Sequence, residues 1–559
     1  MTRKLWALGV LLLTPAWLTG CGDEEKVIVE PEAAIQISAT VDNSTIDSGG
    51  KVTVTAAVEG QREGLTYSWV SEDGRFARAT SASTDWYAPD DPGLYSLSCI
   101  VTDGIDVGIA TVMVGVDTYV PTETPAYVGS SACAVCHNGG SGGNQFATWS
   151  TTVHAHAIEA LNGIGQGNNT ACVGCHTVGT MGLNADAALN NGGYDETAVP
   201  RLQGVQCENC HGPGSEHPSV DFGSVQVSMD AAVCGGCHTD EHHPTYDEWQ
   251  ESAHSGFVES PAGRASCAKC HNGYYSAEFL NDPEGFQSPS EDPTEMLAVT
   301  CAVCHDPHGN DNPSNLRDAS VTDRVLPNAV LVEKAGAGRL CMSCHNGRRT
   351  ETDVDGMIEN GSGHFGPHHS IQGDMLAGVN AYEKINEAFE FTSSKHILVQ
   401  DACVTCHTHA HEGDIPNGIA NFTGHTFEPT VEACAGCHGQ LTSFRDVIAK
   451  QDFDGNGQIE GVQDEIDGLL ANLEQTIIDA SVADSSRAAL EANFEGTMGS
   501  AAYTTKDQRK AAYNWAYVSF DHSHGVHNAN YAVQLLQQSI LFLNPGALPA
   551  RAYVLQSDE

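Results

Sequence analysis

The chain has 559 residues, and its 72 aspartates and glutamates against 25 lysines and arginines give a formal net charge of −47. So acidic a chain is a poor partner for nucleic acids and anionic lipids. It favours cations, basic proteins or mineral surfaces, although solubility alone also accounts for much of such a charge.

The first 20 residues predict a signal peptide. Arg3 and Lys4 precede the apolar run "LWALGVLLLTPAWLTG", which is too short for a spanning helix with these flanks. The string that ends at Cys21 resembles a bacterial lipobox, and Gly22 fits sorting to the outer membrane. We therefore expect export and a lipid on Cys21 as the membrane anchor. The alternative is an ordinary cleaved signal with a stray cysteine.

Residues 33–118 predict an antiparallel β-sandwich. Five short alternating segments, "AIQISATV", "KVTVTAAV", "LTYSWV", "GLYSLSCIVTD" and "IATVMVGV", are separated by Gly, Asp, Asn and Pro. Trp69 and Tyr95 resemble residues of immunoglobulin-like and polycystic-kidney-type modules of surface proteins. Cys99 has no partner in this region, so we expect a buried free thiol. The module is interpreted as a spacer or adhesion unit, and "DTYVPTETPAY" as a linker.

Residues 126–445 contain nine C-x-x-C-H motifs, the attachment signature of c-type haem. Cysteines at i and i+3 lie on one side of a helical turn, where both sulfurs reach the vinyl groups of one porphyrin, and the histidine at i+4 ligates the iron. The predicted haem-binding residues are Cys133, Cys136, His137, Cys172, Cys175, His176, Cys207, Cys210, His211, Cys234, Cys237, His238, Cys267, Cys270, His271, Cys301, Cys304, His305, Cys341, Cys344, His345, Cys403, Cys406, His407, Cys434, Cys437 and His438. Zinc ribbons also use C-x-x-C pairs, but here a histidine follows every pair.

This region has about 36 residues for each motif, and its helical or strand periodicity is weak. We therefore expect a loop-rich fold with few regular elements, in which nine closely spaced macrocycles supply much of the core.

The remaining 17 of the 26 histidines are candidates for the second axial position of each iron. His308 stands three residues after His305, so it cannot reach the opposite face of that haem and would bind the iron of a neighbour. Two segments leave a choice, between His154 and His156 and between His368 and His369. The predicted distal ligands are His154, His217, His243, His254, His308, His369, His396, His425 and His527. For each of them a surface or propionate-bonding histidine is the alternative.

The strings "YVGSSACAVCH", "GVQCENCHGPGSEH", "TCAVCHDPHG" and "GVHNANYAVQLL" resemble the large multihaem c-type cytochromes of metal-reducing bacteria over roughly residues 126–545. These cytochromes are related to the superfamily of hydroxylamine oxidoreductase and pentahaem nitrite reductase. The resemblance implies stacked and perpendicular haem pairs with bis-histidine ligation. It also implies distal ligand roles for His308 and His527.

From these features we expect an electron conduit rather than an enzyme, acting in extracellular electron transfer at the outer membrane. Expected partners are other multihaem cytochromes or outer-membrane conduits, and extracellular metals or minerals. The alternatives are a periplasmic or surface reductase of a nitrogen or sulfur oxyanion, which needs one open iron, and an adhesin that stores electrons. The sequence contains no C-x-x-C-K motif, the usual mark of such an open iron.

Residues 446–559 predict a mainly helical part that begins with a calcium loop. In "DFDGNGQIEGVQDEIDGLL", Asp452, Asp454, Asn456, the Gln458 carbonyl and Glu465 are candidate Ca²⁺ ligands of an EF-hand-type loop. Position 12 of the loop is Gln463, so Glu465 or Glu460 has to substitute for the usual glutamate; an acidic solvated turn is the alternative. The spacing of Ile466, Leu469, Leu470, Leu473 and Ile477 predicts an amphipathic helix.

Overall fold

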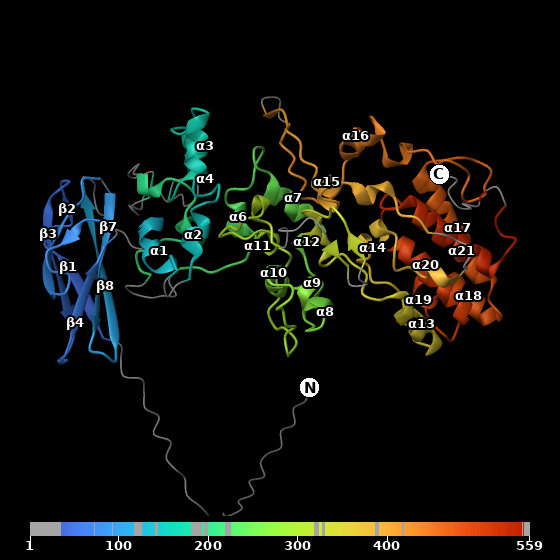
Figure 1. Ribbon diagram of the computed structural model, residues 1–559, viewed down its shortest axis with the longest axis horizontal. Coiled ribbons are helices and arrows are strands. Elements are labelled where there is room, and N and C mark those ends of the chain that lie inside the picture. Colours follow the sequence, from blue (N-terminus) through green and yellow to red (C-terminus); the bar gives the residue numbers. More distant parts are fainter. Residues whose placement is uncertain are drawn as a thin grey trace, which may run out of the picture.

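The computed structural model describes residues 35–116 except 72 and 92, 126–179 except 140–142, 193–194, 200–217, 225–317, 324–326, 330–385, 391–415, 419–549 and 552. The predicted signal peptide, Cys21 and most of the linker lie outside these residues. The β-strand region, the loop-rich middle and the helical C-terminal part follow one another along the long axis (Figure 1).

Eight strands form two four-stranded sheets over residues 37–116. They are β1 Ile37–Val41, β2 Thr45–Ile46, β3 Lys51–Val58, β4 Thr66–Val70, β5 Arg75–Phe76, β6 Ser83–Tyr87, β7 Gly93–Thr102 and β8 Val107–Val116. One sheet has the order β1-β3-β6-β5 and the other β2-β8-β7-β4. The alternating burial of β7 places Leu97, Cys99 and Val101 in a core that residues of both sheets share.

The structure adds four details to the β-strands predicted for this region. The five predicted strands are present, and the structure adds the central strand β6, whose Trp86 is fully buried. The short strand β2 pairs with β8 in parallel, so the sheets are not wholly antiparallel. The Tyr95 hydroxyl donates to the Asp91 carbonyl at 2.8 Å, the bond of a tyrosine corner. Cys99 is a buried free thiol, and burial raises its pKa to about 11.

The middle of the chain consists of short helices joined by loops, as the weak periodicity predicts. Its helices are α1 Ser130–His137, α2 Gln145–Trp149, α3 Ala157–Gly163, α4 Thr170–His176, α5 Cys207–His211, α6 Ala232–Gly235, α7 Thr245–Glu251, α8 Glu259–Ala262, α9 Ala268–His271, α10 Gly273–Asn281, α11 Cys301–Cys304, α12 Gly338–Met342, α13 Glu351–Glu359, α14 Gln372–Ala377, α15 Cys403–His407 and α16 Ala435–His438. The two-residue strands β9 Arg324–Val325 and β10 Leu331–Val332 pair with each other.

The C-terminal part is helical, as predicted. It contains α17 Val462–Asp479, α18 Asp484–Ala492, α19 Phe494–Thr497, α20 Lys506–Ser519 and α21 Ala529–Leu543. On α17 the predicted apolar face is buried at Ile466, Leu469, Leu473 and Ile477. These residues share the largest core with α20, α21 and also α13 and α14. The helices after residue 445 are therefore packed onto elements that precede it.

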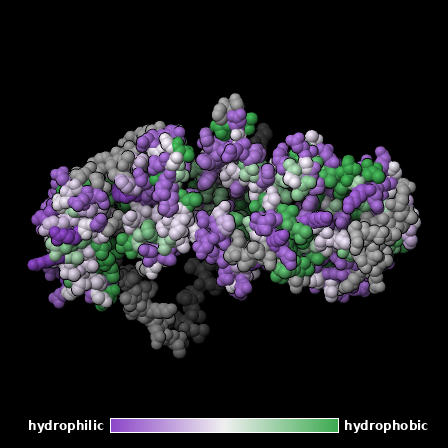
Figure 2. Space-filling model, turned by 45° about the horizontal axis from the view of Figure 1, so that its top comes forward, coloured by the Kyte–Doolittle hydropathy of each residue, from purple (hydrophilic) through white to green (hydrophobic). Residues whose placement is uncertain are grey.

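Hydrophilic residues cover much of the face in Figure 2, with patches of hydrophobic residues between them. Among the described residues, no helix has both the length and the apolar character needed to cross a membrane.

Candidate haem sites

Each C-x-x-C-H motif lies on a short helical turn or includes the cap of one. The turns are α1, α4, α5, α6, α9, α11, α12, α15 and α16, in chain order. On such a turn, residues at i and i+3 face the same way. Both cysteines of a motif can therefore reach the same porphyrin edge.

The structure brings eight motif histidines close to a second histidine, with varied angles between the two ring planes. Two imidazoles that ligate one metal ion from opposite sides have ring centres roughly 6 Å apart, since each nitrogen lies about 2 Å from the ion. The observed ring-centre separations are 5.9–6.4 Å. The pairs are His137–His217, His154–His238, His211–His308, His254–His345, His271–His368, His305–His425, His396–His438 and His407–His527. For the ninth motif, His176 has His243 as an electrostatic neighbour.

Hydrogen bonds fix the orientation of many of these rings. The Nδ1 atoms of His176, His305 and His407 bond backbone carbonyls at 2.9, 2.8 and 2.7 Å. The Nδ1 of His396 likewise bonds the Val526 carbonyl at 2.6 Å. An Nδ1–H that donates to a carbonyl leaves Nε2 as the free lone pair, the state that binds iron. The donor set therefore fits a metal between each pair of rings.

The structure distinguishes the candidates in the two ambiguous segments. His156 engages both ring nitrogens, with Glu159 and the Ser150 carbonyl, whereas His154 faces His238. In the other segment His368 faces His271, and the His369 ring stacks on Phe520 at 4.0 Å. In this segment the geometry favours His368 over His369, the residue that the sequence predicted, because adjacent residues point to different sides of the loop.

His308 faces His211 of the motif at Cys207, and their rings are parallel to within 4°. The turn that carries it is closed by the Gly309 N–H, which donates to the Asp306 carbonyl at 3.0 Å. Gly309 has a φ of +88°, and a Cβ there would lie 2.4 Å from Thr152. Glycine is therefore needed for this loop to pack against the segment that leads to His154.

Two tryptophans anchor the segments of His154 and His254 in the same way, and both histidines stand in the tryptophan-serine-histidine contexts visible in the sequence. Trp149 and Trp249 each precede a distal histidine by five residues. Their indole N–H groups donate at 3.0 Å to the carbonyls of Val205 and Val299. Each of these carbonyls lies two residues before a motif, so each tryptophan ties a distal histidine's segment to another haem site.

The motifs contact one another through their cysteines. Cysteine side chains of different motifs are close neighbours in five pairs: Cys133 and Cys207, Cys175 and Cys237, Cys234 and Cys301, Cys270 and Cys344, and Cys341 and Cys403. Electrostatic contacts join Cys210 to Cys234, Cys304 to Cys341 and Cys406 to Cys434. The motifs at residues 133, 207, 234, 301, 341, 403 and 434 therefore form one continuous row. The motif at 172 joins the row at 234, and the motif at 267 joins it at 341.

Comparison with known proteins matches three segments of this chain to families. Residues 132–212 match cytochrome c554 and c-prime, residues 295–350 the doubled CXXCH motif, and residues 386–554 cytochrome c552. The chain is a multihaem c-type cytochrome. It binds haem c covalently through C-x-x-C-H motifs.

Relatives of this cytochrome include the multiheme cytochrome MtrA of Shewanella baltica, 23% identical over 32% of this chain and 53% of the relative. The C-type polyheme cytochrome OmcB of Geobacter sulfurreducens is 24% identical over 33% of this chain and 26% of its own. Cytochrome c-554 of Nitrosomonas europaea is 34% identical over 16% of this chain and 39% of its own. The cytochrome thus spans about half the length of MtrA and about a quarter of OmcB. No solved structure matches it.

The acidic loop of this cytochrome brings three carboxylates together before α17. Oxygens of Asp452, Asp454 and Glu465 lie within 4.8 Å of one another. Glu465 is fully buried, and it accepts hydrogen bonds from the N–H groups of Phe453, Asp454 and Glu460. It therefore faces the loop from the start of α17.

The other residues of this loop have different partners. The Asn456 side chain bonds Asp454 and Glu460, and its oxygen accepts the Gln458 N–H at 2.7 Å. The Gln463 amide donates to the Ser523 carbonyl at 3.2 Å, so it points away from the loop and towards the segment of His527.

Proposed function

We propose that this cytochrome is an electron-transfer protein in which nine haems are each held between two histidines. A bound c-type haem supplies an iron that takes up and releases one electron. The chain holds the ring in place through two cysteines, ligates the iron from both faces and keeps neighbouring sites in contact.

The observation that carries this proposal is the pairing of the histidines. A catalytic iron needs one open coordination position, whereas the histidine pairs offer two ligands to each of eight irons. We assign His243 to the ninth iron, opposite His176. We also assign His368, rather than His369, to the iron of His271. Reduction of a nitrogen or sulfur oxyanion at an open haem is the alternative.

The continuous row of cysteine contacts supports conduction over the length of the region. A haem attached at a motif would have one porphyrin edge at its cysteines, so neighbouring cysteines of two motifs would bring two porphyrin edges close together. Electrons can then pass between sites without a mobile carrier.

The test is a count of iron spin states by electron paramagnetic resonance of the purified oxidised protein. Nine low-spin irons are expected, because two imidazoles produce a strong ligand field. One high-spin iron whose signal shifts with nitrite, hydroxylamine or sulfite would instead favour the reductase.

We further propose that the protein is exported and held at the outer membrane by a lipid on Cys21, with other multihaem cytochromes or extracellular metals and minerals as electron partners. An immunoglobulin-like module at residues 33–118 would act as a spacer. Protease treatment of intact cells should degrade the protein if it faces the medium. A Cys21→Ala variant should be released from the membrane fraction, and retention of that variant would contradict lipid anchoring.

We also propose that Asp452, Asp454 and Glu465 bind a structural Ca²⁺, with Asn456 and the Gln458 carbonyl completing the site. Three clustered carboxylates repel one another, and a divalent cation removes that cost. Chelation by EGTA should therefore lower the apparent Tm, and Ca²⁺ should restore it. Asp452→Asn should abolish this Ca²⁺ dependence, whereas the exposed control Asp484→Asn on α18 should retain it. An apparent Tm that EGTA leaves unchanged would argue for a solvated acidic turn.

A further inference from the structure

Three cationic side chains lie beside one haem site, the motif at Cys267 together with His368. Arg348 acts electrostatically on both His271 and His368, and Arg349 acts on His368. Lys269 and Arg348 act on Cys270 of the same motif. In a chain with 72 acidic and 25 basic residues, this local excess of positive charge is unusual.

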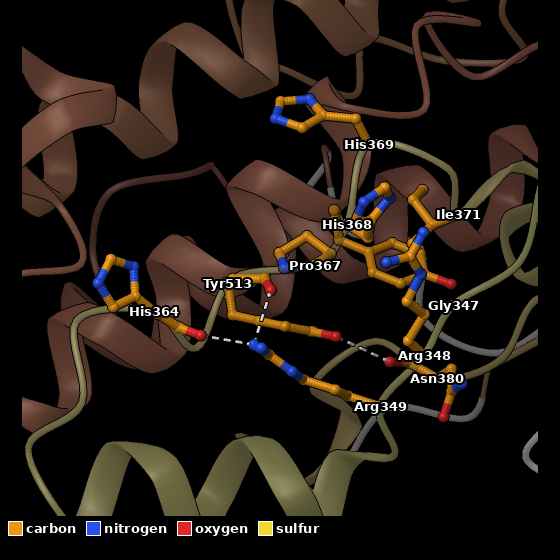
Figure 3. A pocket seen from close by; sticks show the side chains of 12 residues that line it. Gly347, Arg348, Arg349, His364, Pro367, His368, His369, Ile371, Asn380 and Tyr513 are labelled. Atoms are coloured by element: carbon orange, nitrogen blue, oxygen red, sulfur yellow. Dashed lines mark hydrogen bonds between the residues drawn. The ribbon is translucent and has the colours of Figure 1, made fainter. Parts of the chain in front are cut away.

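The cations line the space where this haem is expected. One cavity of about 270 Å³ is lined by Cys267, Cys270, Lys269 and Arg348, among others. A second cavity of similar size is lined by Arg348, Arg349 and His368 (Figure 3). Arg348 thus borders both cavities.

Arg349 is held in position by the backbone. Its guanidinium donates to the His364 carbonyl at 2.6 Å and to the Gly366 carbonyl at 3.2 Å (Figure 3). Two carboxylates bond residues that flank Arg348 and Arg349. Asp374 accepts a hydrogen bond from the Gly347 N–H, and Asp353 accepts one from the Thr350 N–H. The charges that act on His271 and His368 are nevertheless those of the arginines and of other histidines.

At five other haem sites a carboxylate is a charged neighbour of a candidate ligand or a motif cysteine. Asp306 acts on His308, Glu248 on His425, Asp521 on His527, Asp240 on His243 and Glu432 on Cys434. The closest of them is Asp521, which bonds the Nδ1 of His527 at 2.7 Å. The charges beside the His271–His368 site are thus opposite in sign to those beside His425, His527, His243 and Cys434, whereas His308 has Arg317 as well as Asp306 for a neighbour.

The same site lies beside the row rather than in it. In the part of the chain that the structure describes, the motif at Cys267 contacts another motif through Cys270 and Cys344. The motif at Cys341 also contacts Cys304 and Cys403, its neighbours on either side in the row. An electron can therefore travel along the row without passing through the His271–His368 site.

We propose that the haem between His271 and His368 is a side branch and has the highest reduction potential of the nine, because Lys269, Arg348 and Arg349 lie beside it. This inference rests on the proposed electron-transfer function. It adds that one haem stores an electron beside the path along which the others conduct. Reduction would lower the positive charge on the iron by one unit, and nearby cations favour this less positive state because they repel the oxidised one more strongly. The branch would fill first and release its electron last.

The test is a reductive titration of the holoprotein followed by electron paramagnetic resonance and haem absorbance. His368→Ala assigns the signal, because it removes one ligand and turns that haem high-spin. In the wild type, the assigned low-spin signal should disappear first. In Arg348→Gln, about one ninth of the absorbance change should move from the high-potential end to lower potential.

Three further variants separate charge from structure. Arg348→Lys keeps the charge and should restore the wild-type titration, whereas Lys269→Gln should move the same component in the same direction as Arg348→Gln. Arg487→Gln removes an exposed cation of α18, which is bound to Asp479 and Glu491, and should leave the titration unchanged. An assigned signal that disappears late in the wild type, or that Arg348→Gln leaves in place, would overturn the proposal. Failure of the electron-transfer function would appear separately, as a high-spin iron in the unmutated protein.

Discussion

A single histidine, His308, illustrates how the sites are linked at the scale of one residue. It stands three residues after its own motif, on a turn that Gly309 closes, and it faces His211 across 6.1 Å. The proposed ligand assignment gives His308 to the haem attached at Cys207, and His305 and His425 to the haem attached at Cys301. In that assignment the nonapeptide "CAVCHDPHG" contributes ligands to two haems.

Replacing His308 with Ala should therefore affect the haem at Cys207 and spare the haem at Cys301. About one ninth of the iron should become high-spin, because His211 alone gives a weaker ligand field. The matched control is His369→Ala, which removes a ring stacked on Phe520 and should keep every iron low-spin. Electron paramagnetic resonance spectra of the two oxidised variants measure this spin-state change. A wholly low-spin His308→Ala protein would contradict the assignment of His308 as a ligand.

At the scale of elements, a buried carboxylate joins two haem-bearing helices. Glu208 of α5 is buried, and its side chain accepts hydrogen bonds from the N–H groups of Val128, Gly129 and Gly214. Val128 and Gly129 lead directly into α1. One side chain thus sets the distance between the motifs at Cys133 and Cys207, in a region that has little core of its own.

Glu208→Gln should lower the free energy of unfolding by about 1–3 kcal/mol, because the amide group places a donor where a backbone N–H needs an acceptor. The apparent unfolding midpoint in denaturant, followed by haem absorbance, measures the loss. Glu251→Gln, at an exposed position, serves as the control and should unfold like the wild type. Equal midpoints for the two variants would show that the carboxylate does not hold α1 and α5 together.

At the scale of the whole molecule, the β-strand region and the haem-binding region have separate cores. Trp86, Leu97 and Val101 belong to a cluster made up of residues 35–116. The largest cluster instead joins residues 354–385 with residues 466–548. Stability of one region should therefore be independent of the other.

Trp86→Ala should unfold the β-strand region alone, since truncating a fully buried tryptophan costs about 3–5 kcal/mol. Limited proteolysis should cut this region, while haem content and spin state stay as in the wild type. Val107→Ala, at a half-exposed position of β8, should remain resistant. Loss of haem from Trp86→Ala would mean that the two regions fold as one unit.

The chain after residue 520 contains both the proposed haem ligand His527 and the core residues of α21. Removing the chain from residue 520 onward is expected from the sequence to leave one haem high-spin and the other eight intact. The structure places Tyr531, Leu535 and Leu536 of α21 in the largest core, so this truncation also removes packing. His527→Ala tests the ligand without that loss, and one high-spin iron among nine is the expected spectrum.

Local chemistry made much of this protein predictable from its sequence. The C-x-x-C-H spacing needs only one helical turn, so the nine motifs could be identified as candidate attachment sites without knowledge of the fold. Alternation predicted five strands, and helical periodicity predicted the buried face of α17. The strand of Trp86 was missed because only five residues, between loops, carry its pattern.

Tertiary structure decided what depends on residues far apart in the chain. Neighbouring histidines such as His368 and His369 are equivalent in sequence, and only the direction of the loop brings one of them to His271. The order of the sites along the row, and the cations gathered beside one of them, likewise arise from contacts between distant segments. Spacing along the chain fixes which residues bind a haem, whereas packing fixes which haems are neighbours and what charge each one meets.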